Sequence, residues 1–194
     1  MRLCKLLLAV VSATIIIAGA LAGSVSARNF SFSSLTDRAT WNRLNFIGGF
    51  GTVECEVVLR GSFHTRTLTK TVGTLIGLIT EGVVTRCARG GATVNRGSLP
   101  WHRRYRGFTG TLPNITSVAE TIAGAEFDVR EPTFGAVCII TNATSTGTFT
   151  VSSGTVIERT LSSIDTCEDF SVIISGSTTN VESGTGPRLT ITLI

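Results

Sequence analysis

The chain has 194 residues and a formal net charge of +4, with 42% apolar and 15% charged residues. This positive charge is too weak for a nucleic-acid-binding protein, because such proteins carry dense basic faces. The length is sufficient for one domain with its own core, and no second domain is required. We therefore expect a single domain and no nucleic-acid partner.

The N-terminal residues have the pattern of a secretory signal peptide. Arg2 and Lys5 precede an almost wholly apolar run over residues 6–23, and a Val-Ser-Ala tripeptide follows at 25–27. Signal peptidase reads short side chains at such a site, so we expect residues 1–27 to be cleaved. The alternative is an uncleaved membrane anchor, because the apolar run approaches the length that spans a bilayer.

Cleavage leaves residues 28–194 as the mature chain. Its net charge is +2, because Arg2 and Lys5 are removed and no acidic residue is lost. We expect this chain to form one β-sandwich domain that a bacterium secretes or displays at the cell surface. It would then not be an integral membrane protein.

Four cysteines remain in the mature chain, at Cys55, Cys87, Cys138 and Cys167. An even number in an exported chain predicts two disulfides, for which three pairings are possible. Residues 55–87 and 138–167 share a pattern: each begins with Cys on an apolar run, contains Gly-x-Phe and then Gly-Thr, and ends with Cys. This weak internal similarity favours the pairs Cys55–Cys87 and Cys138–Cys167. The chain has no Cys-x-x-Cys spacing and only two histidines, so we expect no metal and no cofactor.

Alternation of apolar and polar residues predicts β-strands throughout. Residues 52–59, 125–131 and 188–194 alternate as a strand with one solvent-exposed face requires. Further β-branched runs, separated by Gly or Ser clusters, cover 62–70, 73–80, 135–141, 146–152, 154–162 and 170–176. Short strands at this spacing are typical of a sandwich or a barrel. We predict an all-β, antiparallel β-sandwich, Ig-like or jelly-roll-like and stabilised by disulfides, with a β-barrel as the alternative.

One segment within this pattern is ambiguous. Residues 114–124 contain Ser117 and Glu120 at the spacing of a helix capping box, and Gly124 could terminate a helix. We expect a strand here, with one or two helical turns as the alternative.

The segment 98–115, SLPWHRRYRGFTGTLPNI, concentrates aromatic and arginine residues between two Leu-Pro steps. Each proline removes a backbone donor and favours extended geometry in the residue before it, so the segment should be extended. Its side chains then divide into two sets, with Trp101, Arg103 and Tyr105 on one face and His102, Arg104, Arg106 and Phe108 on the other.

Two interpretations of this segment remain open. In the first, Trp101 fills the end of the sandwich, and the arginines stack on aromatic rings or reach carboxylates. In the second, the segment is a ligand surface, because flat aromatic rings and forked Arg donors suit sugar rings, carboxylated polymers or phosphate. The predicted ligand-binding residues are Trp101, Arg103, Arg104, Tyr105 and Arg106, and Trp41 and Arg43 could extend either surface. The expected partner is an envelope polysaccharide or another surface polymer.

An enzymatic function is not expected. No Gly-x-Ser-x-Gly elbow is present, and the only imidazoles for a catalytic triad are His64 and His102. Two carboxylate pairs could serve glycoside hydrolysis, namely Glu54/Glu56 and Glu168/Asp169. Outward-facing positions on strands explain both pairs, so a hydrolase acting on extracellular polysaccharide is a minor alternative and we assign no catalytic residue.

The order of the motifs also carries a resemblance. A Cys-bearing strand and a second Cys are followed by LPW, GTLPNI, AEFDV, EPTFGAVC and a final LTITLI. This order resembles a group of uncharacterised secreted bacterial β-proteins over most of the mature chain. The Cys-bearing, Thr- and Gly-rich strands and the LPW step are more distantly similar to the secreted alkane-oxidation activator proteins. That second resemblance implies an extracellular β-sandwich associated with the cell surface.

A binding function and a structural one make different demands on the surface. A binding module should expose Trp101, Tyr105 and the arginines. A structural or assembling surface protein should instead expose a strand edge that can pair, for which residues 145–155 and 189–194 are the best candidates. We expect a non-enzymatic, polymer-binding protein, with assembly as the alternative and the oligomeric state undetermined.

Overall fold

The computed structural model describes residues 29–49, 51–111, 114–133, 135–167, 170–184 and 186–194. The predicted signal peptide, residues 1–27, and the carboxylate pair Glu168/Asp169 lie outside the described residues. Within the described residues the chain forms strands and one short 3-10 turn. They are β1 (Asn29–Phe32), β2 (Thr36–Gly48), β3 (Gly51–Phe63), β4 (Thr67–Thr69), β5 (Leu75–Cys87), β6 (Gly91–Val94), η1 (Arg96–Ser98), β7 (Trp101–Thr111), β8 (Asn114–Arg130), β9 (Val137–Ser152), β10 (Thr155–Cys167), β11 (Phe170–Thr178), β12 (Val181–Ser183) and β13 (Ile191–Leu193).

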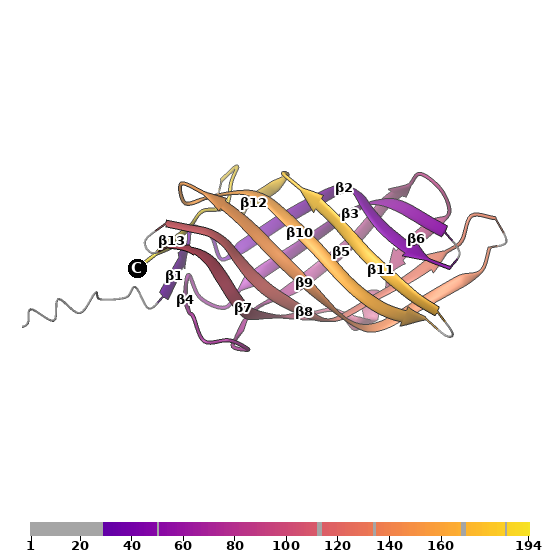
Figure 1. Ribbon diagram of the computed structural model, residues 1–194, viewed down its shortest axis with the longest axis horizontal. Coiled ribbons are helices and arrows are strands. Elements are labelled where there is room, and N and C mark those ends of the chain that lie inside the picture. Colours follow the sequence, from indigo (N-terminus) through magenta and orange to yellow (C-terminus); the bar gives the residue numbers. More distant parts are fainter. Residues whose placement is uncertain (1–28, 50, 112–113, 134, 168–169, 185) are drawn as a thin grey trace, which may run out of the picture.

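Eight of these strands form a sheet that closes on itself (Figure 1). Their order is β11-β10-β9-β8-β7-β5-β3-β2, and every neighbouring pair is antiparallel. The pairing of Ile173 with Ile47 and of Ser175 with Asn45 joins β11 to β2 and completes the circuit. The short strands β6 and β12 pair with β8 and β2 beside it.

A smaller antiparallel sheet, in the order β13-β1-β4, lies at the end of the molecule that carries the C-terminus (Figure 1). It closes that end with aromatic side chains. Phe32 contacts Phe63 of β3 at a centroid distance of 4.2 Å, and Phe30 contacts Tyr105 of β7 at 5.9 Å. The β13 strand also forms an edge, as predicted for residues 189–194.

The all-β, antiparallel prediction is confirmed, with one large and one small sheet around a common core. Closure of the large sheet corresponds to the barrel alternative, because both of its long edges pair with each other. The prediction of short strands is wrong, since β8 has 17 residues and β9 has 16. The predicted runs 135–141 and 146–152 form the single strand β9, in which Asn142 takes the left-handed conformation at φ 52°. Residues 145–155 are not a free edge, because β9 lies between β8 and β10.

The segment 114–124 is a strand, and the helical alternative is wrong. It belongs to β8, which pairs with β7 on one side and β9 on the other. Ile115, Val118 and Ile122 are buried. Ser117 and Glu120 therefore have the spacing of a capping box without forming one, and Glu120 is a buried carboxylate of β8.

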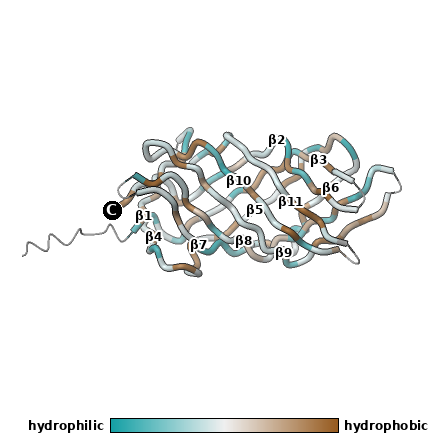
Figure 2. Tube along the Cα trace, viewed as in Figure 1, coloured by the Kyte–Doolittle hydropathy of each residue, from teal (hydrophilic) through white to brown (hydrophobic). Residues whose placement is uncertain are grey.

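The interior of the closed sheet is filled by side chains from opposite walls. Phe46 of β2 contacts Phe127 of β8 at a centroid distance of 5.3 Å, and Phe127 contacts Trp101 of β7 at 5.4 Å. Hydrophobic and hydrophilic residues are interspersed along the strands (Figure 2), because alternate side chains point inward and outward. An eight-stranded closed sheet has an interior just wide enough for such packing.

Both disulfides have the predicted pairing. Cys55–Cys87 joins β3 to β5 at directly opposed positions, and Cys138–Cys167 joins β9 to β10. Disulfides of this kind persist in oxidising compartments, so the pairing is compatible with an extracellular protein. In the part of the chain that the structure describes, no helix has the length and apolar character needed to cross a membrane.

The Cys55–Cys87 disulfide should contribute measurably to stability. The double variant Cys55→Ala/Cys87→Ala should lose about 3 to 4 kcal/mol of unfolding free energy, because a bond that spans 32 residues restricts the unfolded chain. Guanidinium unfolding of the oxidised proteins measures this loss. In the presence of dithiothreitol the variant and the wild type should become equal. A difference that persists after reduction would show that the loss comes from packing instead.

Candidate functional site

The strand β7 divides the aromatic and arginine-rich segment between the inside and the outside of the sheet. Trp101, Arg103 and Tyr105 are buried, whereas Arg104 and Arg106 are exposed. The alternation predicted for this segment is therefore confirmed for residues 101–106 and wrong for Phe108, because a bulge between Tyr105 and Gly107 turns the Phe108 ring toward Phe30 of the core. The three buried residues cannot contact an external polymer, because they point into the packed interior. Arg104 and Arg106 remain as predicted ligand contacts.

Arg103 belongs to a buried cluster of four charged side chains, which we call the interior charge cluster: Asp37 of β2, Arg103 of β7, Glu120 of β8 and Arg159 of β10. All four side chains have zero exposure. Arg103 contacts Asp37 at 2.6 Å and Glu120 at 2.8 Å. Arg159 contacts the same two carboxylates at 3.0 Å and 2.6 Å. Each arginine thus bridges both acids, and the four formal charges sum to zero.

Neutrality and aromatic contacts make this cluster compatible with burial. A buried ion pair must recover the hydration that its charges lose, and it does so only with good geometry and additional contacts. The guanidinium of Arg103 lies 4.3 Å from the ring centre of Phe63, and that of Arg159 lies 4.7 Å from Phe149. Burial alone lowers the pKa of Arg103, but the charges and hydrogen bonds of Asp37 and Glu120 outweigh it and raise the pKa overall. Arg103 is therefore a cation inside the fold.

Two glycines make room for the cluster. A Cβ atom at Gly61 would lie 2.5 Å from Nη1 of Arg103 and 2.6 Å from Oδ1 of Asp37. A Cβ atom at Gly147 would lie 2.9 Å from Oε1 of Glu120. Real Cβ atoms do not approach other atoms this closely, so a side chain at either position would displace the ions.

Sequence reasoning missed Asp37, Glu120 and Arg159. Each occupies an inward position of its strand, where apolar residues are expected: Asp37 is in phase with Ala39 and Trp41. A charged residue at a strand position where its alternate neighbours are apolar is a signal of a buried charge. Two cations and two anions at such positions indicate a neutral interior cluster. Sequence alone does not show that these four residues meet, because their strands are distant along the chain.

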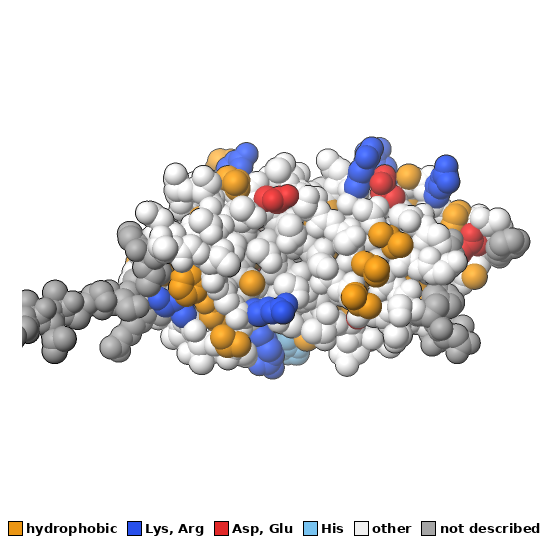
Figure 3. Space-filling view, viewed as in Figure 1, with side chains coloured by type: hydrophobic (Ala, Val, Ile, Leu, Met, Phe, Trp, Pro, Cys, Tyr) orange, Lys and Arg blue, Asp and Glu red, His pale blue; other side chains and the backbone are white. Residues whose placement is uncertain are grey.

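The outward side chains of β7 form a second feature, which we call the outer β7 face: His102, Arg104 and Arg106. Arg104 donates to the backbone oxygen of Gly73 at 3.0 Å, and Arg106 donates to the hydroxyl of Thr146. A shallow groove of about 260 Å³ lies beside Arg106 and is lined by Phe108, Thr109, Ser117, Ala119 and Thr146 among others. Figure 3 shows basic side chains and a histidine together near β7 and β8.

The register partners of the outer β7 face are uncharged residues of β5 and β8. The residues paired with His102 and Arg104 on β8 are Ala123 and Thr121. Among the described residues, neither Arg104 nor Arg106 forms an ion pair with Asp or Glu. The outer β7 face is therefore a basic surface on which anions from outside can pair.

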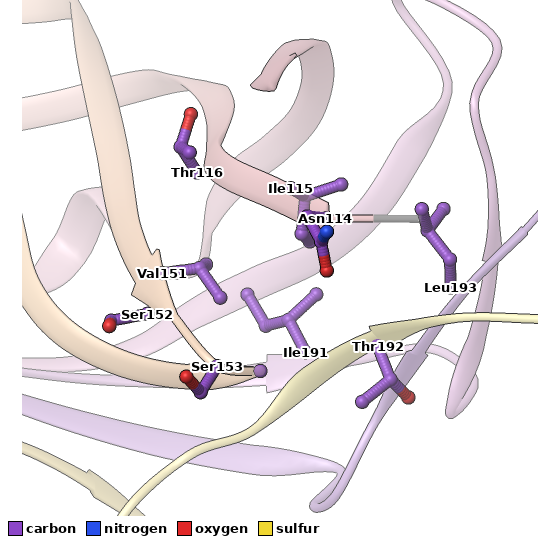
Figure 4. A pocket seen from close by; sticks show the side chains of 10 residues that line it. Asn114, Ile115, Thr116, Val151, Ser152, Ser153, Ile191, Thr192 and Leu193 are labelled. Carbon is purple, nitrogen blue, oxygen red and sulfur yellow. The ribbon is translucent and has the colours of Figure 1, made fainter. Parts of the chain in front are cut away.

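A third feature is a pocket of about 500 Å³ at the end of the closed sheet (Figure 4). It lies between the start of β8, the β9–β10 turn and β13. Its lining combines hydroxyl and amide groups with aliphatic side chains and contains no charged residue: Asn114, Ile115, Thr116, Val151, Ser152, Ser153, Gly154, Ile191, Thr192 and Leu193. Among the described residues, this lining offers hydrogen bonds and aliphatic contacts to a bound group.

The structure also places the other described residues that the sequence singled out. Trp41 is buried, and Arg43 pairs with Glu54 at 3.5 Å on the surface. Glu56 pairs with Arg86 at 2.9 Å, so both carboxylates of the Glu54/Glu56 pair are engaged by arginine. Both histidines are exposed. Within the described residues, no group of three or more His, Cys, Asp or Glu side chains could hold a metal ion.

Comparisons with known proteins assign no family to the chain, since no protein-family model, curated protein or solved structure matches it. The resemblances expected from the motif order therefore stay predictions.

Tyr105 should titrate above the ordinary range of a tyrosine. Burial raises the pKa of Tyr105 in the folded protein. It is the chain's only tyrosine, so the phenolate absorbance during a pH titration reports it alone. The midpoint should lie above that of the guanidinium-unfolded chain, which should be about 10. A folded-state midpoint at or below the unfolded one would contradict the burial of Tyr105.

The raised pKa of Tyr105 also makes the stability of the fold depend on pH. The fold favours the neutral phenol, so the contribution of Tyr105 is fully present below about pH 10 and is lost as the pH rises through the folded-state pKa. The control variant Tyr105→Phe should lack this dependence.

A methyl group at Gly61 should disturb the interior charge cluster. Gly61→Ala should lower the unfolding free energy by about 1 to 3 kcal/mol or more, because the added atom overlaps the Arg103–Asp37 contact. Gly107→Ala on β7 is the matched control, because a Cβ atom there meets open space. Chemical unfolding of both variants measures the difference. Equal stability of the two would contradict the tight packing around the cluster.

Proposed function

We propose that the chain is a secreted, non-enzymatic protein of the cell surface that binds an anionic extracellular polymer through the outer β7 face. The observation that carries this proposal is the pair of exposed guanidinium groups on Arg104 and Arg106, which are held by neutral acceptors and lack a carboxylate partner among the described residues. An external carboxylate or phosphate can supply that partner.

The geometry of β7 supports a repeating ligand. Alternate residues on one face of a strand lie about 6.5 to 7 Å apart, so Arg104 and Arg106 can pair with successive anionic groups of one chain. Arginine's planar fork matches carboxylate and phosphate in two-point contacts. The hydroxyls of Thr109 and Ser117 line the adjacent groove and can bond to a polymer's own hydroxyl groups.

The Phe108 ring packs against Phe30 of the core at 5.8 Å, so the groove beside Arg106 offers mainly polar contacts. Guanidinium groups and hydroxyls together suit an acidic polysaccharide or a polymer of sugar phosphates. Tyr105 and Trp101, which the sequence suggested as contacts, would support this face from within the core.

The assembling alternative has less support from the sheet topology. The long strands of the closed sheet pair on both sides, and full closure removes the edges through which sheets extend. Among the described residues, the strands with a free edge are short, with four residues in β6 and three each in β4, β12 and β13.

The proposal is tested by affinity electrophoresis in gels that contain polygalacturonate, a teichoic acid or neutral dextran. Wild-type protein should be retarded by at least one of the two anionic polymers and not by dextran, and added salt should weaken the retardation. The double variant Arg104→Gln/Arg106→Gln should bind at least about tenfold more weakly, since it loses charge-assisted hydrogen bonds.

The matched control is Arg89→Gln/Arg96→Gln, which removes the same charge from two other exposed positions. It should bind nearly as well as the wild type. Equal weakening in both double variants would show that net charge, and not the outer β7 face, drives retention. Wild-type protein that neither anionic polymer retards would overturn the proposed function.

A further inference from the structure

The pocket at the end of the closed sheet lies beside two strand segments that each lack a neighbour on one side. In the part of the chain that the structure describes, β13 is the outer strand of the small sheet and pairs only with β1. At the start of β8, residues 114–116 precede the ladder with β9, which begins where Ser117 pairs with Thr150. Both segments line the pocket. The pocket is therefore bordered by two unpaired sheet edges.

The backbone of Leu193 points toward the pocket side of β13. Ile194 and Asn29 exchange both of their backbone hydrogen bonds, at 3.1 and 3.3 Å. Hydrogen-bonded and non-hydrogen-bonded pairs alternate along antiparallel strands, so Leu193 occupies a non-hydrogen-bonded position opposite Phe30. Its N–H and C=O groups therefore point away from β1.

The neighbouring turn confirms this direction. Ile191 lies two residues before Leu193 and has the same backbone orientation, and its N–H donates to the backbone oxygen of Gly154 at 2.8 Å. Gly154 belongs to the β9–β10 turn and lines the pocket. The N–H and C=O groups of Leu193 thus lie on the side of β13 that borders the pocket.

These two groups of Leu193 have no backbone partner among the described residues. A donor and an acceptor on one strand residue form half of a hydrogen-bonded antiparallel pair, and a residue of an extended peptide supplies the other half. A sugar hydroxyl can bond to either group, but a peptide residue matches both at once. Addition of a peptide to a free strand edge is an established mode of recognition, in which backbone hydrogen bonds provide affinity.

The side chains of the lining suit an extended peptide as well. Ile115, Val151 and Ile191 are buried, and Figure 4 shows them around the same space. Alternate side chains of a strand point to opposite sides, so one set can contact these aliphatic groups while the other set faces outward. The described lining contains no charged residue, and a charged side chain buried against it would find no opposite charge. Uncharged, aliphatic residues at alternate positions fit best.

We propose that this pocket binds an uncharged extended peptide, which adds as a further strand to the free edge of β13. The backbone of the peptide pairs with Leu193, and its alternate aliphatic side chains contact Ile115, Val151 and Ile191. The start of β8 and the β9–β10 turn flank the pocket. The pocket therefore admits a single strand from a loop or tail of another polypeptide, and not the edge of a second folded domain.

Titration of the ¹⁵N-labelled mature chain with acetyl-Thr-Val-Thr-Val-Thr-amide tests the proposal by NMR. The Leu193 amide should shift with a dissociation constant below about 1 mM, which corresponds to about 4 kcal/mol. Hydrogen exchange of this amide should be fast in the free protein and should slow at least about tenfold with saturating peptide. The Ile194 amide, which donates to Asn29, should be protected in both states.

A modified peptide separates strand addition from side-chain contact. The Leu193 side chain packs toward the core, like that of Ile191, so the peptide residue paired with Leu193 must also point inward. The valines of the peptide occupy that position. Methylation of both valine nitrogens removes the donors that face β13 and should weaken binding at least about tenfold. Equal binding of the methylated peptide would overturn the proposal.

The matched protein variants are Leu193→Pro and Leu193→Val. Proline removes the N–H that faces the pocket and leaves the hydrogen bonds to β1 intact, and edge strands tolerate proline in this orientation. It should weaken binding at least about tenfold, whereas valine keeps the N–H and should bind within about twofold of the wild type. The peptide comparison decides the question if the proline variant does not fold.

Two further outcomes would overturn the proposal. One is a Leu193 amide that does not shift at millimolar peptide, and the other is equal loss of binding in the valine and proline variants. The double variant Arg104→Gln/Arg106→Gln should bind the peptide like the wild type, because its changes lie on the outer β7 face. The peptide and polymer tests can therefore fail independently.

Discussion

The interior charge cluster is the interaction on which the rest of the structure depends. Its four ions come from β2, β7, β8 and β10, and three of their four ion pairs connect strands that are not neighbours in the closed sheet. Every ion has two partners of opposite sign, and none has access to water. Any change in the register of one of these strands would separate charges in the core. The cluster therefore links the closure of the sheet to a single arrangement of its strands.

The same alternation that places the cluster inside also creates the surfaces outside. On β7, Arg103 neutralises two buried carboxylates, while its neighbours Arg104 and Arg106 remain available at the surface. Arginine thus has two physical roles within four residues of one strand. On β10, Arg159 and Ile164 show the corresponding division between a buried cation and an exposed apolar residue. The proposed polymer contact is thus the outer face of a strand whose inner face holds part of the cluster.

The sequence could predict what depends on local pattern. Alternation identified the strands around Cys55 and Phe127, and the repeated spacing of cysteines gave both disulfides. Interactions across the closed sheet could not be predicted in this way. Glu120 has the spacing of a helix cap with Ser117, yet it is a core carboxylate, because β8 is held as a strand by neighbours on both sides. Local propensity gives way here to tertiary pairing.

In the candidate site, too, local pattern predicted the strand geometry but not the contacts across the closed sheet. The sequence predicted that Trp101 and Arg104 lie on opposite faces of an extended segment, and they do. Which face would be inside could not be predicted, because both faces contain arginine. Burial of Arg103 requires the carboxylates of Asp37 and Glu120, which are 66 and 17 residues away in sequence. Only the completed fold brings those partners together.

The most direct test of this account is a double-mutant cycle on Arg103 and Glu120, measured as the free energy of unfolding in guanidinium. Arg103→Met and Glu120→Gln should each cost about 3 to 5 kcal/mol, because each leaves an unbalanced charge in the core. The double variant retains the neutral Arg159–Asp37 pair, so it should lose much less than the sum of the two single losses. Additive losses, or single losses below about 1 kcal/mol, would contradict the central role of the interior charge cluster.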